Sequence, residues 1–137
     1  VVVEVSLDVE PAYLVQQCIY TELPLASLKD HLGDVLEHTY SVSLFTQWQD
    51  GGLINSLWCK HRVEIGTDPA PCAPLAGRPA STVSVHPDPT MPSAEACSPP
   101  GVGASHVQLP HFLPSHTPSH GDELQTELFV ARAHLWE

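Results

Sequence analysis

Apolar and polar residues alternate most regularly between Thr39 and Ile65, on either side of an Asp50-Gly51 pair. Asp-Gly favours a type I′ turn, because both central residues of that turn need positive φ and these two residue types tolerate it. The stretch therefore predicts a long β-hairpin that turns at Asp50-Gly51. A four-residue loop over 49–52 would give the same strand pairing.

The alternation also predicts how the two arms of the hairpin pair. Leu44 is expected opposite Leu57, and a slip by one residue would set apolar side chains against polar partners. One face should then carry five opposed pairs, which are Tyr40 with His61, Val42 with Cys59, Leu44 with Leu57, Thr46 with Asn55 and Trp48 with Leu53. At the open end of the hairpin, Tyr40 and His61 should form a hydrogen-bonded cross-strand pair.

The opposite face of the hairpin is predicted to point outward. It carries the polar side chains Ser41, Ser43, Gln47, Ser56, Lys60, Arg62 and Glu64. Three large apolar residues, Phe45, Ile54 and Trp58, interrupt this face. They indicate either a surface for binding a partner or the place where a loop or helix covers the sheet.

Two segments precede the hairpin and its neighbouring helix. In residues 1–9 every odd position is apolar, whereas the even positions are Val2, Glu4, Ser6 and Asp8. This alternation predicts a half-buried strand. Residues 12–23 have no single period. We favour a helix there, although Val15, Ile19 and Tyr20 would also suit a strand.

A second helix is predicted over residues 27–38. Ser27 can cap its start, and an apolar stripe follows at Leu28, Leu32, Val35 and Leu36. Gly33 lies inside the helix, where glycine costs about 1 kcal/mol relative to alanine. It marks either close packing or a break.

The composition changes at Gly66, because 12 of the 14 prolines lie between residues 66 and 120. Such a segment buries too little apolar surface to offset the entropy of ordering its backbone, so we predict that 66–120 is disordered. Residues 121–137 predict a short amphipathic helix. The helix would present Leu124, Leu128, Leu135 and Trp136 to a partner or to the sheet.

The predicted fold is therefore α+β. Residues 1–65 form a small antiparallel sheet, made of a strand plus the long hairpin, with one or two packed helices. The Pro-rich segment and the C-terminal helix follow it. The chain lacks a starting Met and its first residues resemble the middle of a strand, which favours a fragment of a larger domain.

Charge limits the classes of partner. The chain has 16 acidic and 5 basic residues, a net charge of −11, which disfavours binding to nucleic acid or to an anionic membrane. The sequence contains no long apolar run and no signal peptide pattern. We therefore expect a cytoplasmic protein, with a nuclear location as the alternative.

The four cysteines, Cys18, Cys59, Cys72 and Cys97, form no C-x-x-C pair. In a secreted chain they would indicate two disulfides with three possible connectivities. Because Cys18 and Cys59 fall on predicted core elements, we favour buried thiols there. Cys72 and Cys97 are then incidental thiols of the Pro-rich segment.

Metal binding is the most specific chemistry that the sequence offers. His106, His111, His116 and His120 could gather Zn(II), Ni(II) or Cu(II), although their spacing fits no zinc-finger pattern and intervening prolines hold them apart. A biased tract that binds metal weakly and adventitiously is the simpler interpretation. Cys59, His61 and Cys72 form a second, weaker candidate set.

No catalytic residue and no cofactor is predicted, since the chain lacks a G-x-S-x-G turn and a G-x-x-x-x-G-K-[ST] loop. No stretch matches a family motif. We interpret the chain as a non-catalytic interaction piece of an intracellular scaffold or regulatory protein, bound to a protein partner or to the missing remainder of its domain. Alternatives are weak metal binding, part of an enzyme whose catalytic residues lie outside this chain, and a segment from Gly66 onward that is not selected.

Overall fold

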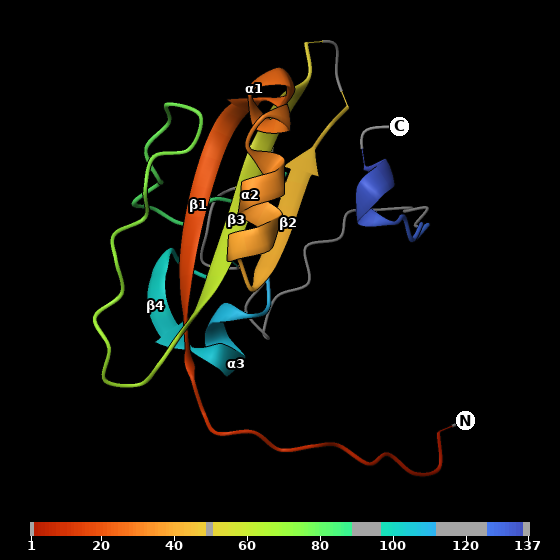
Figure 1. Ribbon diagram of the computed structural model, residues 1–137, viewed down its shortest axis with the longest axis vertical. Helices are drawn as coiled ribbons and strands as arrows, with labels where there is room; N and C mark the ends of the chain where they lie inside the picture. Colours follow the sequence, from red (N-terminus) through yellow and green to blue (C-terminus); the bar gives the residue numbers. More distant parts are fainter. Residues whose placement is uncertain (1, 49–50, 89–96, 112–125, 136–137) are drawn as a thin grey trace.

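The computed structural model describes residues 2–48, 51–88, 97–111 and 126–135. Four strands form one antiparallel sheet in the order β2-β3-β1-β4. The elements are β1 (Leu14–Pro24), α1 (Leu25–Lys29), α2 (Leu32–His38), β2 (Ser41–Thr46), β3 (Leu53–Val63), β4 (Gly101–Ala104), α3 (Ser105–Gln108) and the 3-10 turn η1 (Arg132–His134) (Figure 1). This small antiparallel sheet with few helices agrees with the predicted α+β class.

The β2–β3 hairpin has the predicted register over most of its length. Ser41 pairs with Lys60, and the pairing continues without a slip to Phe45 and Ser56. At Thr46 it shifts by one residue, so that Thr46 pairs with Ile54 and not with Asn55 as predicted. The β-bulge turns Ile54 toward the same core as Leu57, whereas the sequence placed it on the outer face.

The turn of the hairpin also departs from a strict two-residue turn. Gly51 and Gly52 both have positive φ, 100° and 59°, which glycine adopts at little cost. Trp48 lies outside β2, also at positive φ and 83% exposed, so its predicted pairing with Leu53 is wrong. Asp50 lies outside the described residues.

The helix predicted over 12–23 is wrong, because most of this segment forms the central strand β1. It pairs with β3 from Leu14 and Val63 to Pro24 and Leu53. The β-branched and aromatic residues of the segment favour a strand, and both faces of β1 are buried. A strand buried on both faces lacks the simple alternation that would have revealed it.

The strand predicted at residues 1–9 does not form in the described part of that segment. Residues 2–9 run away from the sheet, as the red end of the ribbon shows (Figure 1). Val3 and Val9 are 92% and 97% exposed. The alternation is present, but residues 2–9 pair with none of the four described strands.

The predicted helix over 27–38 is divided into α1 and α2 around Asp30 and His31. The helical segment also starts earlier than Ser27, at Leu25, whose backbone N–H donates a 2.6 Å hydrogen bond to the carbonyl of Gly52. The predicted apolar stripe is confirmed. Leu28 and Leu32 are buried, with Val35 and Leu36 packed beside them on the core.

Both faces of the sheet are covered, which corrects the predicted polar outer face. The helices cover one face, which carries Cys18, Tyr20, Leu57 and Cys59. On the other face, Ile19, Trp58 and Cys97 form a second cluster with Phe45 and Val85. The polar residues that alternate onto this second face are buried too, among them Gln17, Ser56 and Lys60.

The expected disorder of residues 66–120 is not confirmed. β4 pairs with β1 from Leu14 and Ala104 to Gln17 and Gly101, and α3 follows it directly. The N–H of Ser81 donates to the carbonyl of Ile19 at 2.7 Å. Individual hydrogen bonds to the sheet therefore hold a proline-rich chain that has little periodic structure of its own. Residues 89–96 and 112–120 lie outside the described part.

The C-terminal amphipathic helix is not confirmed either. Residues 126–131 have no regular structure, and only the 3-10 turn η1 follows. Leu128 is 83% exposed and Leu135 is 44% exposed. An isolated helix of this length is marginal in water without a surface on which to dock. Leu124 and Trp136 lie outside the described residues.

We predict that the buried face of the hairpin dominates stability. Leu57 is fully buried against the helices, so Leu57→Ala should cost roughly 2 to 5 kcal/mol in the free energy of unfolding. Val3→Ala is the control, because Val3 is 92% exposed and its loss should cost less than about 0.5 kcal/mol. Urea denaturation of the 137-residue chain measures both. Equal losses would contradict the assigned core.

Candidate functional site

A cavity of about 680 Å³ lies beside the helix-covered face of the sheet. Strands β1 and β3, helix α2 and the segment 64–75 form its walls. The side chains that the argument below uses are Gln16, Cys18, Tyr20, His38, Cys59, His61 and Cys72. Since a strand points every second residue to the same face, β1 supplies Gln16, Cys18 and Tyr20 together.

A disulfide between Cys18 and Cys72 forms part of the cavity wall. The predicted free thiols at these two positions are therefore wrong, whereas Cys59 and Cys97 are free and buried. The Cα atoms of Cys18 and Cys72 are 5.8 Å apart, and the residues are separated by 54 positions. In the chain-entropy model, closing a loop of that length stabilises the fold by about 4 kcal/mol.

Two hydrogen bonds hold the segment that carries Cys72 against β1. Gln16 Nε2 donates to the carbonyl of Ala70 at 2.7 Å, and the Tyr20 hydroxyl donates to the carbonyl of Ala73 at 2.6 Å. Together with the disulfide they give this segment three attachments to alternate residues of one strand. One wall of the cavity is thereby fixed by β1.

Two histidines lie on the side of the cavity nearest α2. His61 Nδ1 lies 3.2 Å from the carbonyl of His38, and His38 Nδ1 lies 2.9 Å from the carbonyl of Asp34. The carbonyl of His38, at the end of α2, has no partner within the helix, and an imidazole N–H can satisfy it. The predicted hydrogen bond between Tyr40 and His61 is wrong, because His61 bonds to the helix.

Cys59 is the free thiol of the cavity. It pairs directly with Cys18 across β1 and β3, and it is 3% exposed. Burial raises the pKa of the Cys59 thiol to about 12. Burial also raises the pKa of Tyr20, with a smaller contribution from Cys59. At neutral pH both groups are therefore uncharged.

The other face of the sheet buries a lysine. Lys60 Nζ donates to the carbonyl of Leu109 at 2.6 Å and to that of Pro110 at 3.4 Å. Its side chain is completely buried, and burial lowers the pKa of Lys60 to about 8. The ring centroid of Trp58 lies 5.9 Å from Nζ. Backbone carbonyls and an aromatic ring thus surround the ammonium group.

His111 lies beside this lysine. Its Nε2 atom is 3.1 Å from the Ser43 hydroxyl, and its ring meets Phe45 and Trp58 edge-on at centroid distances of 5.5 and 5.7 Å. Burial lowers the pKa of His111, and the charge of Lys60 lowers it further. The histidine is therefore held neutral as part of a packed aromatic group.

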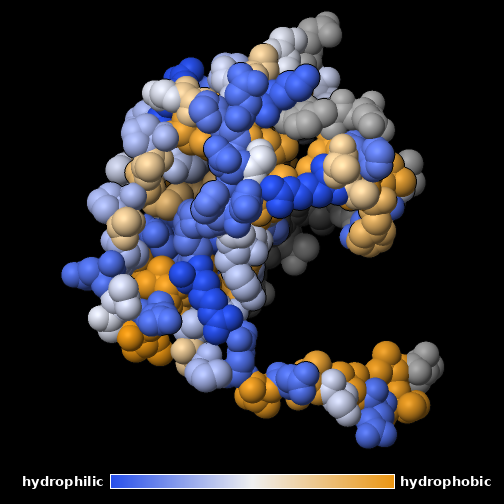
Figure 2. All heavy atoms as spheres, in the orientation of Figure 1, coloured by the Kyte–Doolittle hydropathy of each residue, from blue (hydrophilic) through white to orange (hydrophobic). Residues whose placement is uncertain are grey.

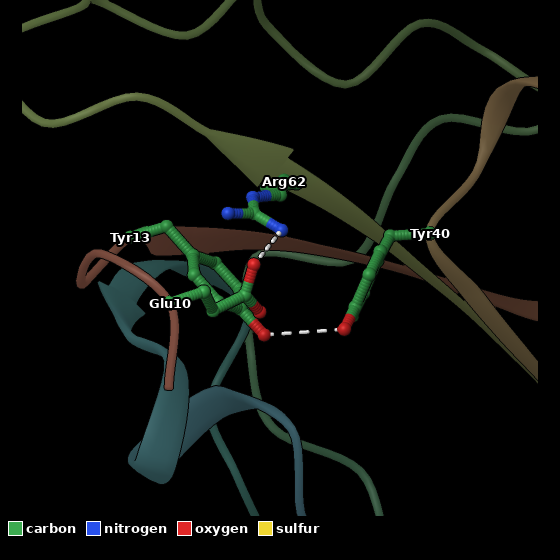
Figure 3. A network of polar contacts seen from close by, with 4 residues as sticks. All are labelled: Glu10, Tyr13, Tyr40 and Arg62. Atoms are coloured by element: carbon green, nitrogen blue, oxygen red, sulfur yellow. Dashed lines mark hydrogen bonds and ion pairs between the residues drawn. The ribbon is translucent and has the colours of Figure 1, made fainter. Parts of the chain in front are cut away.

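A third polar group lies near the start of β1 (Figure 3). Arg62 forms a 2.9 Å ion pair with Glu10 and stacks over the ring of Tyr13, with its guanidinium carbon 3.9 Å from the centroid. The hydroxyls of Tyr13 and Tyr40 are 3.1 Å apart. That hydrogen bond is the main cause of the raised pKa of Tyr13. Because the side chains of Arg62 and Glu10 are exposed, this polar group lies at the surface.

The structure brings none of the predicted histidine ligands together in its described part. His111 packs against aromatic rings, whereas His106 is exposed in α3. His116 and His120 lie outside the described residues. No group of three or more candidate metal ligands was found among the residues described. In the second candidate set of Cys59, His61 and Cys72, the sulfur of Cys72 is bonded to Cys18 and does not serve as a thiolate ligand.

Three members of the predicted interaction surface are covered. Ile54 and Trp58 are fully buried, and Phe45 packs edge-on against Trp58 at 5.6 Å. The sequence allowed for a covering loop at these positions, and residues 81–111 contain the segments that cover Trp58. Leu128 and Leu135 remain exposed.

Sequence reasoning missed two buried groups. The alternation predicts Lys60 on the same outer face as Trp58 but does not show which segment covers that face. The disulfide was weighed only as one possible connectivity among the four cysteines. No local pattern indicates either feature, because both depend on chain segments that are far away in the sequence.

Comparison with known proteins relates the chain to an oxidase. No family model matches it. It is 44% identical over 135 residues to an alditol oxidase of Streptomyces sp. (strain IKD472 / FERM P-14339). The matched region is 98% of this chain and 31% of the alditol oxidase, so the chain spans about a third of the length of this relative.

This similarity corrects the functional interpretation of the sequence. A scaffold or regulatory interaction protein is wrong as the main interpretation, because the relative is an oxidase. The alternative of an incomplete part of an enzyme agrees better with the comparison. The idea of a fragment also fits, since the match covers only part of the relative.

We predict that the buried Lys60 makes stability rise between about pH 8 and pH 9.5. Its folded pKa of about 8 is below the ordinary 10.5, so the unfolded chain binds more protons in this range. The difference in unfolding free energy between the native chain and Lys60→Met should grow by about 1 to 2 kcal/mol. Subtracting the variant removes the contributions of Cys59 and Tyr20, and parallel curves would contradict a buried charged lysine.

Proposed function

We propose that this chain is part of an oxidase that acts on alditols and that the catalytic residues lie outside the chain. The observation that carries the proposal is the 44% identity to an alditol oxidase over 135 residues. The similarity extends over nearly the whole chain. It therefore includes residues from Gly66 onward and supports the view that this part is a selected protein segment.

The chemistry of the described residues supports a structural contribution to such an enzyme. Lys60 and Cys59 are almost completely buried, so neither side chain presents its reactive atom at the surface. Lys60 is enclosed by backbone carbonyls, and the Cys59 thiol stays protonated at neutral pH. The sheet would then serve to support the reacting part of the enzyme.

The exposed residues 2–9 support a contact with the remainder of the oxidase. Their alternation is that of a strand, yet Val2, Val3, Val5, Leu7 and Val9 are 65% to 97% exposed. Figure 2 shows hydrophobic residues along this projecting segment. Soluble proteins rarely leave such a row uncovered. A sheet in the rest of the parent protein is the partner that a strand of this pattern fits.

Other expectations stay predictions. They are the cytoplasmic or nuclear location, the lack of nucleic-acid and membrane partners, and the weak metal binding of the histidine tract. The division of the chain at residues 65 and 120 is also untested. Within the described ranges, none of the helices has the length and apolar character needed to span a membrane.

The test uses the complete protein that contains this chain. With an alditol as substrate, we expect alditol-dependent oxygen consumption and an oxidised product. The 137-residue chain alone should show neither, because the proposal places catalysis elsewhere. The corresponding aldose, tested at the same concentration, is the control for substrate class.

Two results would overturn the proposal. One is a complete protein that binds or turns over no alditol. The other is full oxidase activity in the 137-residue chain by itself, which would place the catalytic residues inside it.

A further inference from the structure

Three of the four cysteines gather at the cavity described above. Cys18, Cys59 and Cys72 all line it, and all three belong to or pack against the same apolar cluster. Cys97 belongs to the cluster on the other face of the sheet. The sheet therefore separates the three clustered sulfurs from the fourth.

The free thiol of this group faces the disulfide through the strand register. Cys59 and Cys18 are direct partners in the antiparallel β1–β3 ladder. Side chains of directly opposed residues point to the same face, with Cβ atoms about 4.5 to 5.5 Å apart. That spacing is close to the Cβ separation of a disulfide, which is about 3.5 to 4.5 Å. A bond between Cys18 and Cys59 therefore needs only a small adjustment.

We propose that Cys59 can replace Cys72 as the disulfide partner of Cys18, so that the cavity is a site of internal thiol–disulfide exchange. The Cys59 sulfur, as thiolate, attacks the Cys18 sulfur. The Cys18–Cys59 bond forms while the Cys18–Cys72 bond breaks, and Cys72 leaves as thiolate. The proton lost by Cys59 is regained at Cys72, so no external oxidant or reductant is consumed.

The two states differ in what is exposed. In the observed state the free thiol is the buried Cys59, whereas Cys72 is partly exposed in the segment that lines the cavity. After exchange the free thiol belongs to Cys72. Its segment loses the covalent bond to β1 and keeps the hydrogen bonds that Gln16 and Tyr20 of β1 donate to the carbonyls of Ala70 and Ala73. Exchange would therefore loosen one cavity wall and present a reactive thiol there.

The rate of exchange should depend steeply on pH. Only the thiolate attacks, and burial raises the pKa of Cys59 to about 12. Below that pKa the thiolate fraction grows tenfold for each pH unit. The disulfide seen in the structure is thus protected at neutral pH and becomes exchangeable in alkaline solution.

The experiment traps the product with iodoacetamide. The non-reduced 137-residue chain is incubated at about pH 8 and about pH 9, and disulfides are mapped by mass spectrometry. We expect a peptide that links Cys18 to Cys59 and carries alkylated Cys72. It should form about ten times faster at the higher pH.

The variants Cys59→Ala and Cys97→Ala, together with Cys97 as an internal control in the native chain, decide the outcome. Cys59→Ala should lower alkylation of Cys72 at least about tenfold, whereas Cys97→Ala should leave it unchanged. Cys97 should not enter any disulfide, because it lies on the opposite face of the sheet. Cys59→Ser is a second variant for the case in which the alanine chain does not fold.

The proposal is overturned if no Cys18–Cys59 peptide forms at either pH. It is also overturned if Cys72 is alkylated equally fast without the Cys59 thiol. Disulfides of Cys97 that appear as quickly as the Cys18–Cys59 bond would show exchange in the unfolded chain, and they would contradict a site built by the fold.

Discussion

The antiparallel pairing of β1 with β3 is the contact on which the rest of the structure depends. Each strand has 11 residues, and the ladder runs from Leu14 and Val63 to Pro24 and Leu53. Both strands are central in the sheet, so each has a neighbour on both sides. The helices, the edge strands β2 and β4, and the proline-rich segment all attach to this pair.

The two faces of this pair carry different chemistry. One holds an apolar core with a disulfide and a protonated thiol, whereas the other holds a lysine and a histidine among aromatic rings. Burial has opposite effects on the charged forms: it suppresses ionisation of Cys59 and favours loss of the proton from Lys60. The fold can bury Lys60 because the backbone carbonyls of Leu109 and Pro110 accept hydrogen bonds from its ammonium group.

How much the sequence could predict depended on the range of the interactions involved. The hairpin register was predictable, because a turn signal and period-two alternation lie within a few residues of each other. β1 was not, since burial on both faces removes the alternation. The cover over Lys60 depends on residues 109 and 110, and the disulfide joins positions 54 apart. Only the folded chain brings these together.

The segment before β1 shows the opposite case, in which a clear local pattern has no partner. Residues 2–9 have the alternation of a strand, but alternation provides a surface and not the neighbouring backbone that a strand needs. Under the proposed function, the remainder of the oxidase would supply that neighbour. The sequence pattern thus indicated a strand, but a strand forms only where a neighbouring strand is available to pair with it.

Native-state hydrogen exchange of the backbone amides tests the central role of the β1–β3 pair most directly. Amides in the middle of both strands, such as those of Cys18 and Cys59, should exchange most slowly of all, because these residues are direct partners in the β1–β3 ladder and open only when the whole domain unfolds. Those of residues 2–9 should exchange at nearly the rate of an unstructured peptide. Amides of β1 that exchange as quickly as residues 2–9 would contradict this account.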